Sequence, residues 1–140
     1  MKKGNQIEAI VFRKKDLEFE FLLLKRTKER GGFWQPITGE IEKDETPEEA
    51  AKRELKEEIN VKNILGIIKD VHSYTLEGTG KREVVLGVEI LSNEKISLEK
   101  NIYKEHEEKK WVKFNEAIKL LKWPGNIEGL KRLNKILTKK

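Results

Sequence analysis

Three glutamates on one predicted helix have the clearest potential for chemistry in this chain. Glu54, Glu57 and Glu58 are spaced i, i+3 and i+4, which places their side chains on one face of a helix. Two carboxylates about 5 Å apart repel each other by roughly 3 kcal/mol at an effective dielectric constant of about 20. The repulsion is relieved if the side chains spread into water or if a divalent cation binds them. The spacing therefore predicts either an exposed charged face or a metal site.

The helix that carries these acids has a clear start. Thr46 is the expected N-cap, Pro47 the first helical residue, and Glu49 the residue that closes a capping box. Helix-forming residues then continue through residues 48–58. The apolar stripe of the helix, spaced i, i+4 and i+8, consists of Ala51, Leu55 and Ile59.

Residues 39–61 resemble the signature of the Nudix hydrolases, a loop–helix–loop that binds a metal–diphosphate. The residues that match are Gly39, Glu45, Arg53, Glu54, Leu55, Glu57, Glu58 and Val61. One position departs from the signature, because Asn60 stands where the family has a glycine. Asn is the next best residue for a left-handed helix end, so we expect the loop to keep its form.

The resemblance implies an α/β fold, namely the Nudix-type α/β/α sandwich with a mixed central sheet, formed by residues 1–140 as a single domain. It also implies a metal-dependent pyrophosphohydrolase that cleaves a nucleoside triphosphate or a related compound to a monophosphate and pyrophosphate. The alternatives are a dinucleoside polyphosphate or nucleotide-sugar hydrolase of the same fold, or an RNA-acting or RNA-binding protein.

The local charge fits a cation that receives a polyphosphate. Residues 40–58 contain nine acids and four bases, a net charge of −5, in a chain whose total is +5. The resemblance implies that Glu57 and Glu58 coordinate Mg²⁺ or Mn²⁺, with the main-chain carbonyl of Gly39 as a further ligand. Ligands that are all oxygens suit these hard ions.

Two neighbours of the metal ligands have supporting roles in this scheme. Glu54 is expected to bind the metal or to orient a water. Arg53 can pair with Glu57 and with Glu45, holding the carboxylates in place, and the alternative for Arg53 is an ordinary surface ion pair.

Glu105-His106, followed by Trp111, resembles a branch of the family that includes dihydroneopterin triphosphate pyrophosphatases and related nucleoside triphosphate pyrophosphatases. The resemblance implies that Glu105 adds a carboxylate to the metal site. A solvated charge cluster is the alternative in this lysine- and glutamate-rich segment. We expect His106 to be structural or exposed.

The predicted catalytic residues are thus Arg53, Glu54, Glu57, Glu58 and Glu105, and the predicted metal ligands are Gly39, Glu54, Glu57, Glu58 and Glu105.

Segments 33–36 and 123–126 resemble the same branch and suggest where a substrate binds. Trp34 and Trp123 could stack on a base or pterin ring, although aromatic side chains also fill cores, and Trp34 could pack under the motif helix. Lys25 and Arg26 could meet phosphates where a strand ends, or simply reach water. The predicted substrate-binding residues are Lys25, Arg26, Trp34, Gln35 and Trp123.

The remaining elements follow from periodicity and turn residues. Strands are expected at residues 7–12, 19–25, 64–68, 71–76, 82–91 and 109–114. Residues 21–24 are apolar on both faces, which places the second strand centrally in a sheet covered on both sides. Asn115 is the expected cap of a helix that ends at Leu121, and residues 123–126 should separate it from a final helix.

Composition limits the partners. A pI of about 9.3 is typical of proteins that bind nucleic acid. The ten bases of residues 109–140, however, accompany an apolar helical stripe. This pattern favours a solvated helix face, and we do not expect nucleic acid as a partner.

The longest apolar run, residues 21–24, is too short to span a bilayer. The absence of cysteine and of an apolar leader at the N-terminus fits a cytoplasmic protein, which we expect to be a monomer or homodimer.

Overall fold

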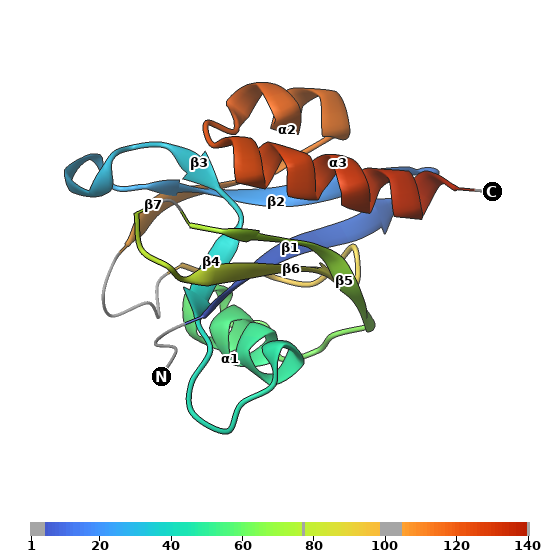
Figure 1. Cartoon of the computed structure of the whole chain (residues 1–140). Helices are drawn as coiled ribbons and strands as arrows, with labels where there is room; N and C mark the ends of the chain where they lie inside the picture. The colour runs from blue at the N-terminus through green and yellow to red at the C-terminus, as the bar shows by residue number, and fades with distance from the viewer. Residues whose placement is uncertain (1–4, 77, 99–104, 140) are drawn as a thin grey trace.

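The computed structural model describes residues 5–76, 78–98 and 105–139. A mixed β-sheet forms its central layer, with one helix on one face and two helices on the other (Figure 1). This arrangement confirms the predicted α/β/α sandwich. In chain order the elements are β1 (Gln6–Lys15), β2 (Glu18–Arg26), a short 3₁₀ helix (Lys28–Arg30), β3 (Trp34–Gln35), β4 (Ile37–Glu40), α1 (Pro47–Ile59), β5 (Gly66–Thr75), β6 (Arg82–Glu89), β7 (His106–Val112), α2 (Phe114–Leu120) and α3 (Pro124–Thr138).

The sheet is mixed because β1 pairs with one neighbour in parallel and with two others in the antiparallel sense. β1 runs parallel to β6, while β2 and β4 pair antiparallel with its second and first halves. The main strand order is β3-β2-β1-β6-β5, and β7 joins β2. The β1–β4 register places Gly39 opposite Ile7. The segment 39–61 that resembles the family signature therefore begins on a strand attached to the centre of the sheet.

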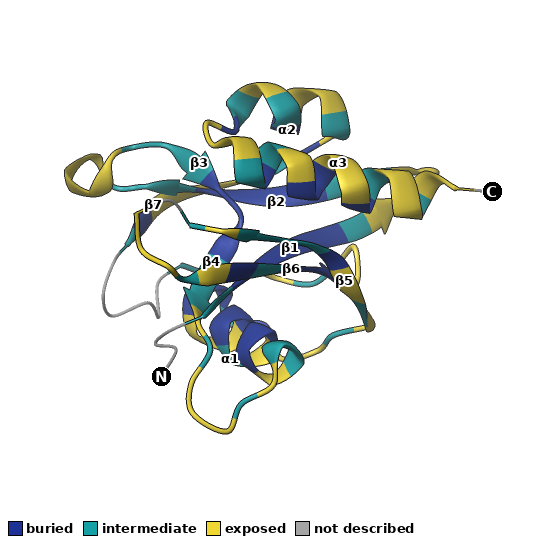
Figure 2. Cartoon of the chain, viewed as in Figure 1, coloured by how far each residue is buried: buried dark blue, intermediate teal, exposed yellow. Residues whose placement is uncertain are grey.

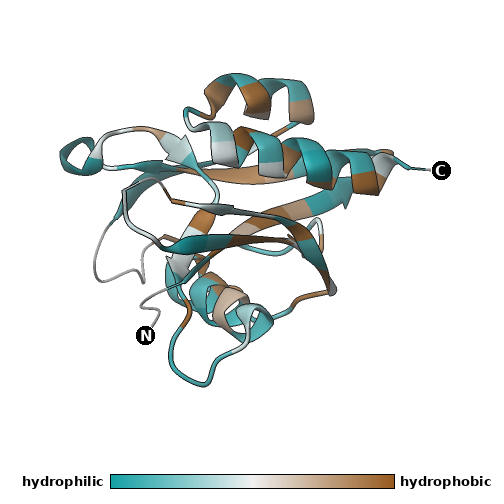
Figure 3. Cartoon of the chain, in the orientation of Figure 1, coloured by the Kyte–Doolittle hydropathy of each residue, from teal (hydrophilic) through white to brown (hydrophobic). Residues whose placement is uncertain are grey.

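Alternation along β1 divides the core into two layers. Ile7, Ala9 and Val11 face α1, whereas Ile10 and Phe12 face α2 and α3, as expected when successive side chains point to opposite sides of a strand. β2 alternates in the same way, which confirms that it is covered on both faces. Figure 2 shows the buried strands between exposed outer helix faces, and Figure 3 shows apolar residues concentrated on the sheet and the inward helix faces.

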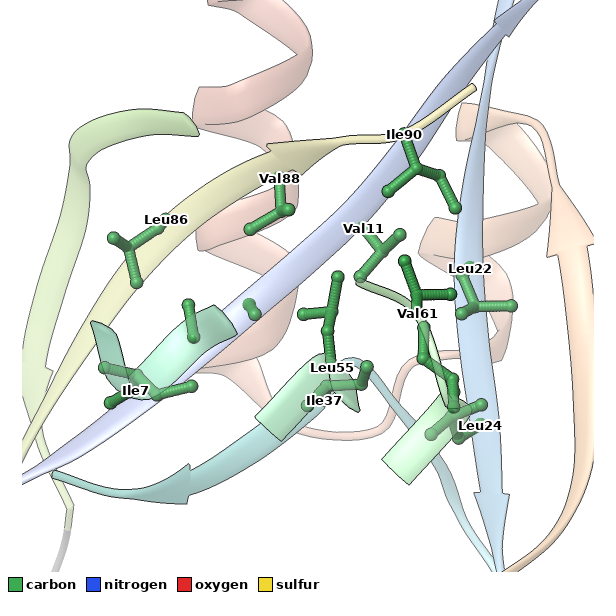
Figure 4. Packing of buried hydrophobic residues seen from close by; sticks show 14 residues of the cluster. Ile7, Val11, Leu22, Leu24, Ile37, Leu55, Val61, Leu86, Val88 and Ile90 are labelled. Carbon is green, nitrogen blue, oxygen red and sulfur yellow. The ribbon is translucent and has the colours of Figure 1, made fainter. Parts of the chain in front are cut away.

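α1 begins and packs as its sequence predicts. Thr46 accepts a hydrogen bond from the Glu49 amide while the Glu49 carboxylate accepts one from the Thr46 amide, which completes the capping box. The predicted apolar stripe of α1 is fully buried. In Figure 4, Leu55 and Val61 lie among side chains of β1, β2 and β6. This packing fixes the rotation of α1 about its axis and hence the direction of its carboxylates.

The C-terminal helices differ in detail from the prediction. Lys113, without a side-chain hydrogen bond, occupies the N-cap of α2, so Asn115 lies inside the helix and does not cap it. Segment 123–126 is not a break, because Pro124 is already the first residue of α3 and its fixed φ is compatible with a first helical turn. The final strand also begins earlier than predicted, at His106. The sequence predicts a loop over residues 95–104. Residues 95–98 lie outside helices and strands, as this predicts, and residues 99–104 fall outside the described residues.

No helix within the described residues is both long enough and apolar enough to cross a membrane.

Asn60, the one departure from the family signature, ends α1 in the left-handed conformation with φ of 58°. Replacing Asn60 by Gly should leave the free energy of unfolding unchanged or raise it slightly, since glycine adopts this conformation without a steric penalty. Asn60→Ala should lower it by about 1 kcal/mol. Urea denaturation measures both, with the exposed Asn93→Ala as control. Equal stability of the alanine and glycine variants at position 60 would contradict this account.

Candidate functional site

Arg53 is the centre of the hydrogen-bond network around the motif loop. Its guanidinium donates to both carboxylate oxygens of Glu45, at 2.8 and 3.1 Å, and to the main-chain carbonyl of Glu40 at 2.8 Å. It also bonds to Glu54 at 3.0 Å and Glu57 at 3.3 Å. These distances confirm the predicted contacts of Arg53 with Glu45 and Glu57. The Glu45 hydrogen bonds raise the pKa of Arg53 and lower that of Glu45, so both groups stay charged.

The carboxylate of Glu54 lies directly against the backbone of Gly39. Glu54 is only 9% exposed, and a Cβ built on Gly39 would overlap its carboxyl group. A glycine is therefore required at this position because the acid occupies the space that a side chain would fill. Burial raises the pKa of Glu54 to about 7, against the opposing effect of the Arg53 guanidinium.

Glu58 lies in a second buried network that sequence reasoning did not predict. Its carboxylate is 3.3 Å from Nδ1 of His106, and Nε2 of His106 is 3.0 Å from the side-chain amide nitrogen of Gln35. An amide nitrogen donates only, so Nε2 accepts and the Nδ1–H group of the neutral ring donates to Glu58. All three side chains are buried. His106 is therefore a positioning group for Glu58.

The three motif glutamates do not share one environment. Glu54 and Glu58 are buried, whereas the side chain of Glu57 is 58% exposed. Within the described part of the chain, no three His, Cys, Asp or Glu side chains lie close enough together to hold a metal ion as they stand. Glu105 accordingly does not complete such a group, although its carbonyl accepts a hydrogen bond from the Thr27 amide at 3.1 Å.

The chemical nature of the donors nevertheless fits Mg²⁺ or Mn²⁺. The side chains on this face of α1 offer carboxylate oxygens, and the absence of a side chain on Gly39 lets the Glu54 carboxyl lie against the backbone of β4. Hard divalent ions prefer such oxygens. Burial of Glu54 beside two further acids also leaves negative charge that Arg53 neutralises only in part.

A cavity of about 740 Å³ lies beside the motif and is called the Trp123 cavity below. Its lining residues include Arg26, Gln35, Thr38, Tyr74, Glu83, Trp123 and Asn126. Thr38 directly precedes Gly39, and Gln35 belongs to the Glu58 network. Gln35 and Thr38 therefore link the cavity to the motif through β3 and β4.

The predicted substrate-binding residues divide into two groups. Arg26, Gln35 and Trp123 line the cavity, with Trp123 45% exposed and held edge-to-face on Phe33 at 5.5 Å. Lys25 instead pairs with Glu107 and Glu108 on β7. Trp34 packs on the α2–α3 side of the sheet and not under the motif helix, because its strand position points it away from α1.

A buried polar cluster, also missed in the sequence, forms one wall of the cavity. The Tyr74 hydroxyl donates to Glu8 at 2.9 Å and lies 3.4 Å from Glu83, and the Asn126 amide donates to Glu8 at 2.9 Å. Burial is the main cause that raises the pKa of Glu8 to about 8 and that of Glu83 to about 7. Burial also raises the pKa of Tyr74.

A signal for this cluster is present in the sequence. Glu8 lies two residues before Ile10 and four before Phe12 on one strand, and Glu83 lies two residues before Val85 on another. Residues two apart on a strand point to the same face, so both acids occupy positions where apolar residues face α3. An acid on the inward face of an apolar strand predicts a buried carboxyl that needs partners. The partners themselves come from β5 and α3, far away in the chain.

The profile of the NUDIX domain matches residues 4–133. An octanoyltransferase from Myxococcus xanthus is 32% identical over 115 residues, which are 82% of this chain and 32% of that protein. A dihydroneopterin triphosphate diphosphatase from Haemophilus influenzae is 44% identical over 59 residues, which are 42% of this chain and 36% of that protein. The chain thus spans about a third of the length of the curated relatives it matches.

Among solved structures, a NUDIX hydrolase from Listeria monocytogenes is similar over 95% of this chain and 93% of its own. The TM-score is 0.82 and the sequence identity is 27%. This similarity extends over both helical layers and the sheet, in agreement with the predicted fold.

Gly39→Ala should displace the Glu54 carboxyl from its place against β4 and break its contact with Arg53. We expect the free energy of unfolding to fall by about 1–3 kcal/mol, as for other overpacked sites. Chemical denaturation measures the loss. Gly66→Ala is the matched control, since Gly66 also lies in a strand and an added Cβ there meets nothing within 4 Å. If both variants lose the same stability, the Gly39–Glu54 contact does not constrain the site.

Glu8→Gln should stabilise the protein increasingly as the pH rises from about 5 to 8. The folded pKa of about 8 lies above the ordinary value of 4.5, so the native state keeps a proton that the unfolded chain loses, and stability falls through this pH range. A neutral amide removes that loss, which amounts to a few kcal/mol at the upper end. Thermal unfolding at several pH values, with the exposed Glu29→Gln as control, tests this. A pH-independent difference between Glu8→Gln and the wild type would refute it.

Proposed function

Because the chain belongs to the Nudix family, we propose that it is a metal-dependent pyrophosphohydrolase that cleaves a nucleoside triphosphate, or a related compound with a heterocyclic ring, to a monophosphate and pyrophosphate. The observation that carries the proposal is the chain of hydrogen bonds that links the Trp123 cavity to Glu58 of α1. Gln35 lines the cavity and also holds His106 against Glu58. A ring bound in the cavity would thus have its phosphates directed to α1.

Four groups of the motif would hold Mg²⁺ or Mn²⁺: the carboxylates of Glu54, Glu57 and Glu58 and the carbonyl of Gly39. Glu105, which directly precedes β7, would have to move toward the motif to add a further carboxylate. When bound, the metal would neutralise phosphate oxygens and help to activate the attacking water. Exposed Glu57 remains accessible to a hydrated cation, while buried Glu54 and Glu58 are held by protein contacts.

The residues of the chain then have distinct tasks. Arg53 holds Glu54 and the 40–45 loop in one arrangement, so the carboxylates do not move apart when a polyphosphate approaches. Glu54 orients the attacking water or binds the metal. Arg26, whose guanidinium bonds to the Arg30 carbonyl and lies 5.6 Å from the Phe33 ring, is placed to bind phosphate from the cavity side. Trp123 offers a face for stacking on the ring.

The triphosphate substrate is also supported by similarity. The matched part of the Haemophilus influenzae protein, whose name specifies dihydroneopterin triphosphate, is 44% identical to this chain. A pterin triphosphate and a nucleoside triphosphate both combine a flat nitrogen ring with a phosphate chain, which suits a cavity that contains an aromatic side chain and adjoins an acidic metal site.

Glu57→Gln and Glu58→Gln should each lower the rate of pyrophosphate release in Mg²⁺ by about 100-fold or more, because each removes charge that binds the cation. A panel of nucleoside and pterin triphosphates, assayed for pyrophosphate release, provides the measurement. Glu128→Gln on the exposed face of α3 is the control and should keep full activity.

Circular dichroism shows whether the variants keep the fold. The proposal fails if the wild type turns over no diphosphate compound. The ligand assignment fails if folded Glu58→Gln keeps near-full activity.

A further inference from the structure

Glu83 is a buried carboxyl group with too few donors. It is only 3% exposed and lines the Trp123 cavity. Its Oε1 atom has no hydrogen-bond partner among the described residues, and its Oε2 atom has one long contact of 3.4 Å with the Tyr74 hydroxyl. A buried carboxylate is costly to keep unless donors surround it.

The Tyr74 hydroxyl, which contacts both acids, has a single proton and lies closer to Glu8, at 2.9 Å, than to Glu83. The Asn126 amide also donates to Glu8. Oε1 of Glu83 is left without a hydrogen-bond partner among the described residues, in a side chain that lines the cavity.

The wall that presents Glu83 is held rigidly. A Cβ on Gly125 would overlap the Tyr74 ring, so the ring packs directly on the first turn of α3. Tyr74 and Glu83 are paired residues of β5 and β6. Oε1 is buried in the structure, and rotation of the carboxyl group about its last bond, a torsion with a broad energy minimum, would turn it toward a ligand in the cavity.

We propose that Glu83 determines the specificity of the Trp123 cavity by accepting two hydrogen bonds from a heterocycle that carries a ring N–H beside an exocyclic amino group, the edge shared by guanine and pterins. The inference rests on the proposed function, because it places the ring in the cavity and the phosphates at α1. Trp123 supplies the stacking face, and the two oxygens of Glu83 match two adjacent donors, as in other bidentate carboxylate pairs.

Other ring edges fit this acceptor pair less well. Adenine presents an amino group beside a ring nitrogen that is itself an acceptor, which repels a carboxylate oxygen. Hypoxanthine keeps the ring N–H but lacks the amino group. Loss of one charge-assisted hydrogen bond should lower kcat/KM by about 10- to 100-fold.

The test compares kcat/KM for GTP, ITP and ATP, since ITP differs from GTP only by the missing amino group. The wild type should prefer GTP to ITP by about 10- to 100-fold. Glu83→Gln, which replaces one acceptor by a donor, should bring this ratio toward one and raise ATP relative to GTP. Glu89→Gln, at the end of the same strand, should leave the ratio unchanged. Equal use of GTP and ITP by the wild type overturns the inference without any variant.

A second comparison distinguishes the two kinds of ring that present this edge, guanine and pterin. Dihydroneopterin triphosphate is assayed beside GTP, and the compound with the higher kcat/KM shows whether the recognised edge is that of a pterin or of guanine. Trp123→Ala should lower kcat/KM for every ring while keeping the GTP to ITP ratio.

Failure of the inference can be distinguished from failure of the proposed function. If no triphosphate is hydrolysed, the proposed function fails, and binding of guanosine and inosine is then measured by quenching of tryptophan fluorescence without metal. Tighter binding of guanosine, lost in Glu83→Gln, supports the role of Glu83. Equal affinity for the two nucleosides overturns it.

Discussion

The contact between the Glu54 carboxyl and the backbone of Gly39 is the constraint on which the site depends. β4 carries Gly39 and is hydrogen-bonded to the central strand β1, so the position of the glycine is set by the sheet. α1 can bring its acids to β4 only because no side chain stands between them. Arg53 then joins Glu54 to the motif loop through Glu45 and the Glu40 carbonyl. The carboxylates of Glu45 and Glu54 are thus held close together by packing and by the guanidinium of Arg53, which bonds to both.

The two functional regions are joined through buried side chains. Gln35 in β3, His106 in β7 and Glu58 in α1 form a chain of hydrogen bonds from the Trp123 cavity to the motif. β3 and β7 both pair with β2, so the chain of hydrogen bonds connects α1 to one part of the sheet. The cavity and the motif are thereby held in a fixed relation.

The buried acids Glu8 and Glu83 reduce stability near neutral pH, since burial raises the pKa of both above the ordinary value. Apolar residues at these strand positions would avoid that loss. Their presence beside a cavity is consistent with a role in recognition, where an unfilled acceptor gains its hydrogen bonds from the ligand. Glu8 and Tyr74 are hydrogen-bonded to each other, while Oε1 of Glu83 has no hydrogen-bond partner among the described residues.

The sequence by itself determined the local features. The capping signals of Thr46, Pro47 and Glu49 specify where α1 starts, and the left-handed tolerance of Asn60 specifies where it ends. The continuous apolar run of residues 21–24 specifies a strand covered on both faces. These follow from residues close together in the chain. Only the tertiary structure decided which motif glutamates are buried, that His106 contacts Glu58, and that Oε1 of Glu83 has no hydrogen-bond partner among the described residues. Each of these depends on groups from strands and helices far apart in the chain, whose distances no local pattern contains.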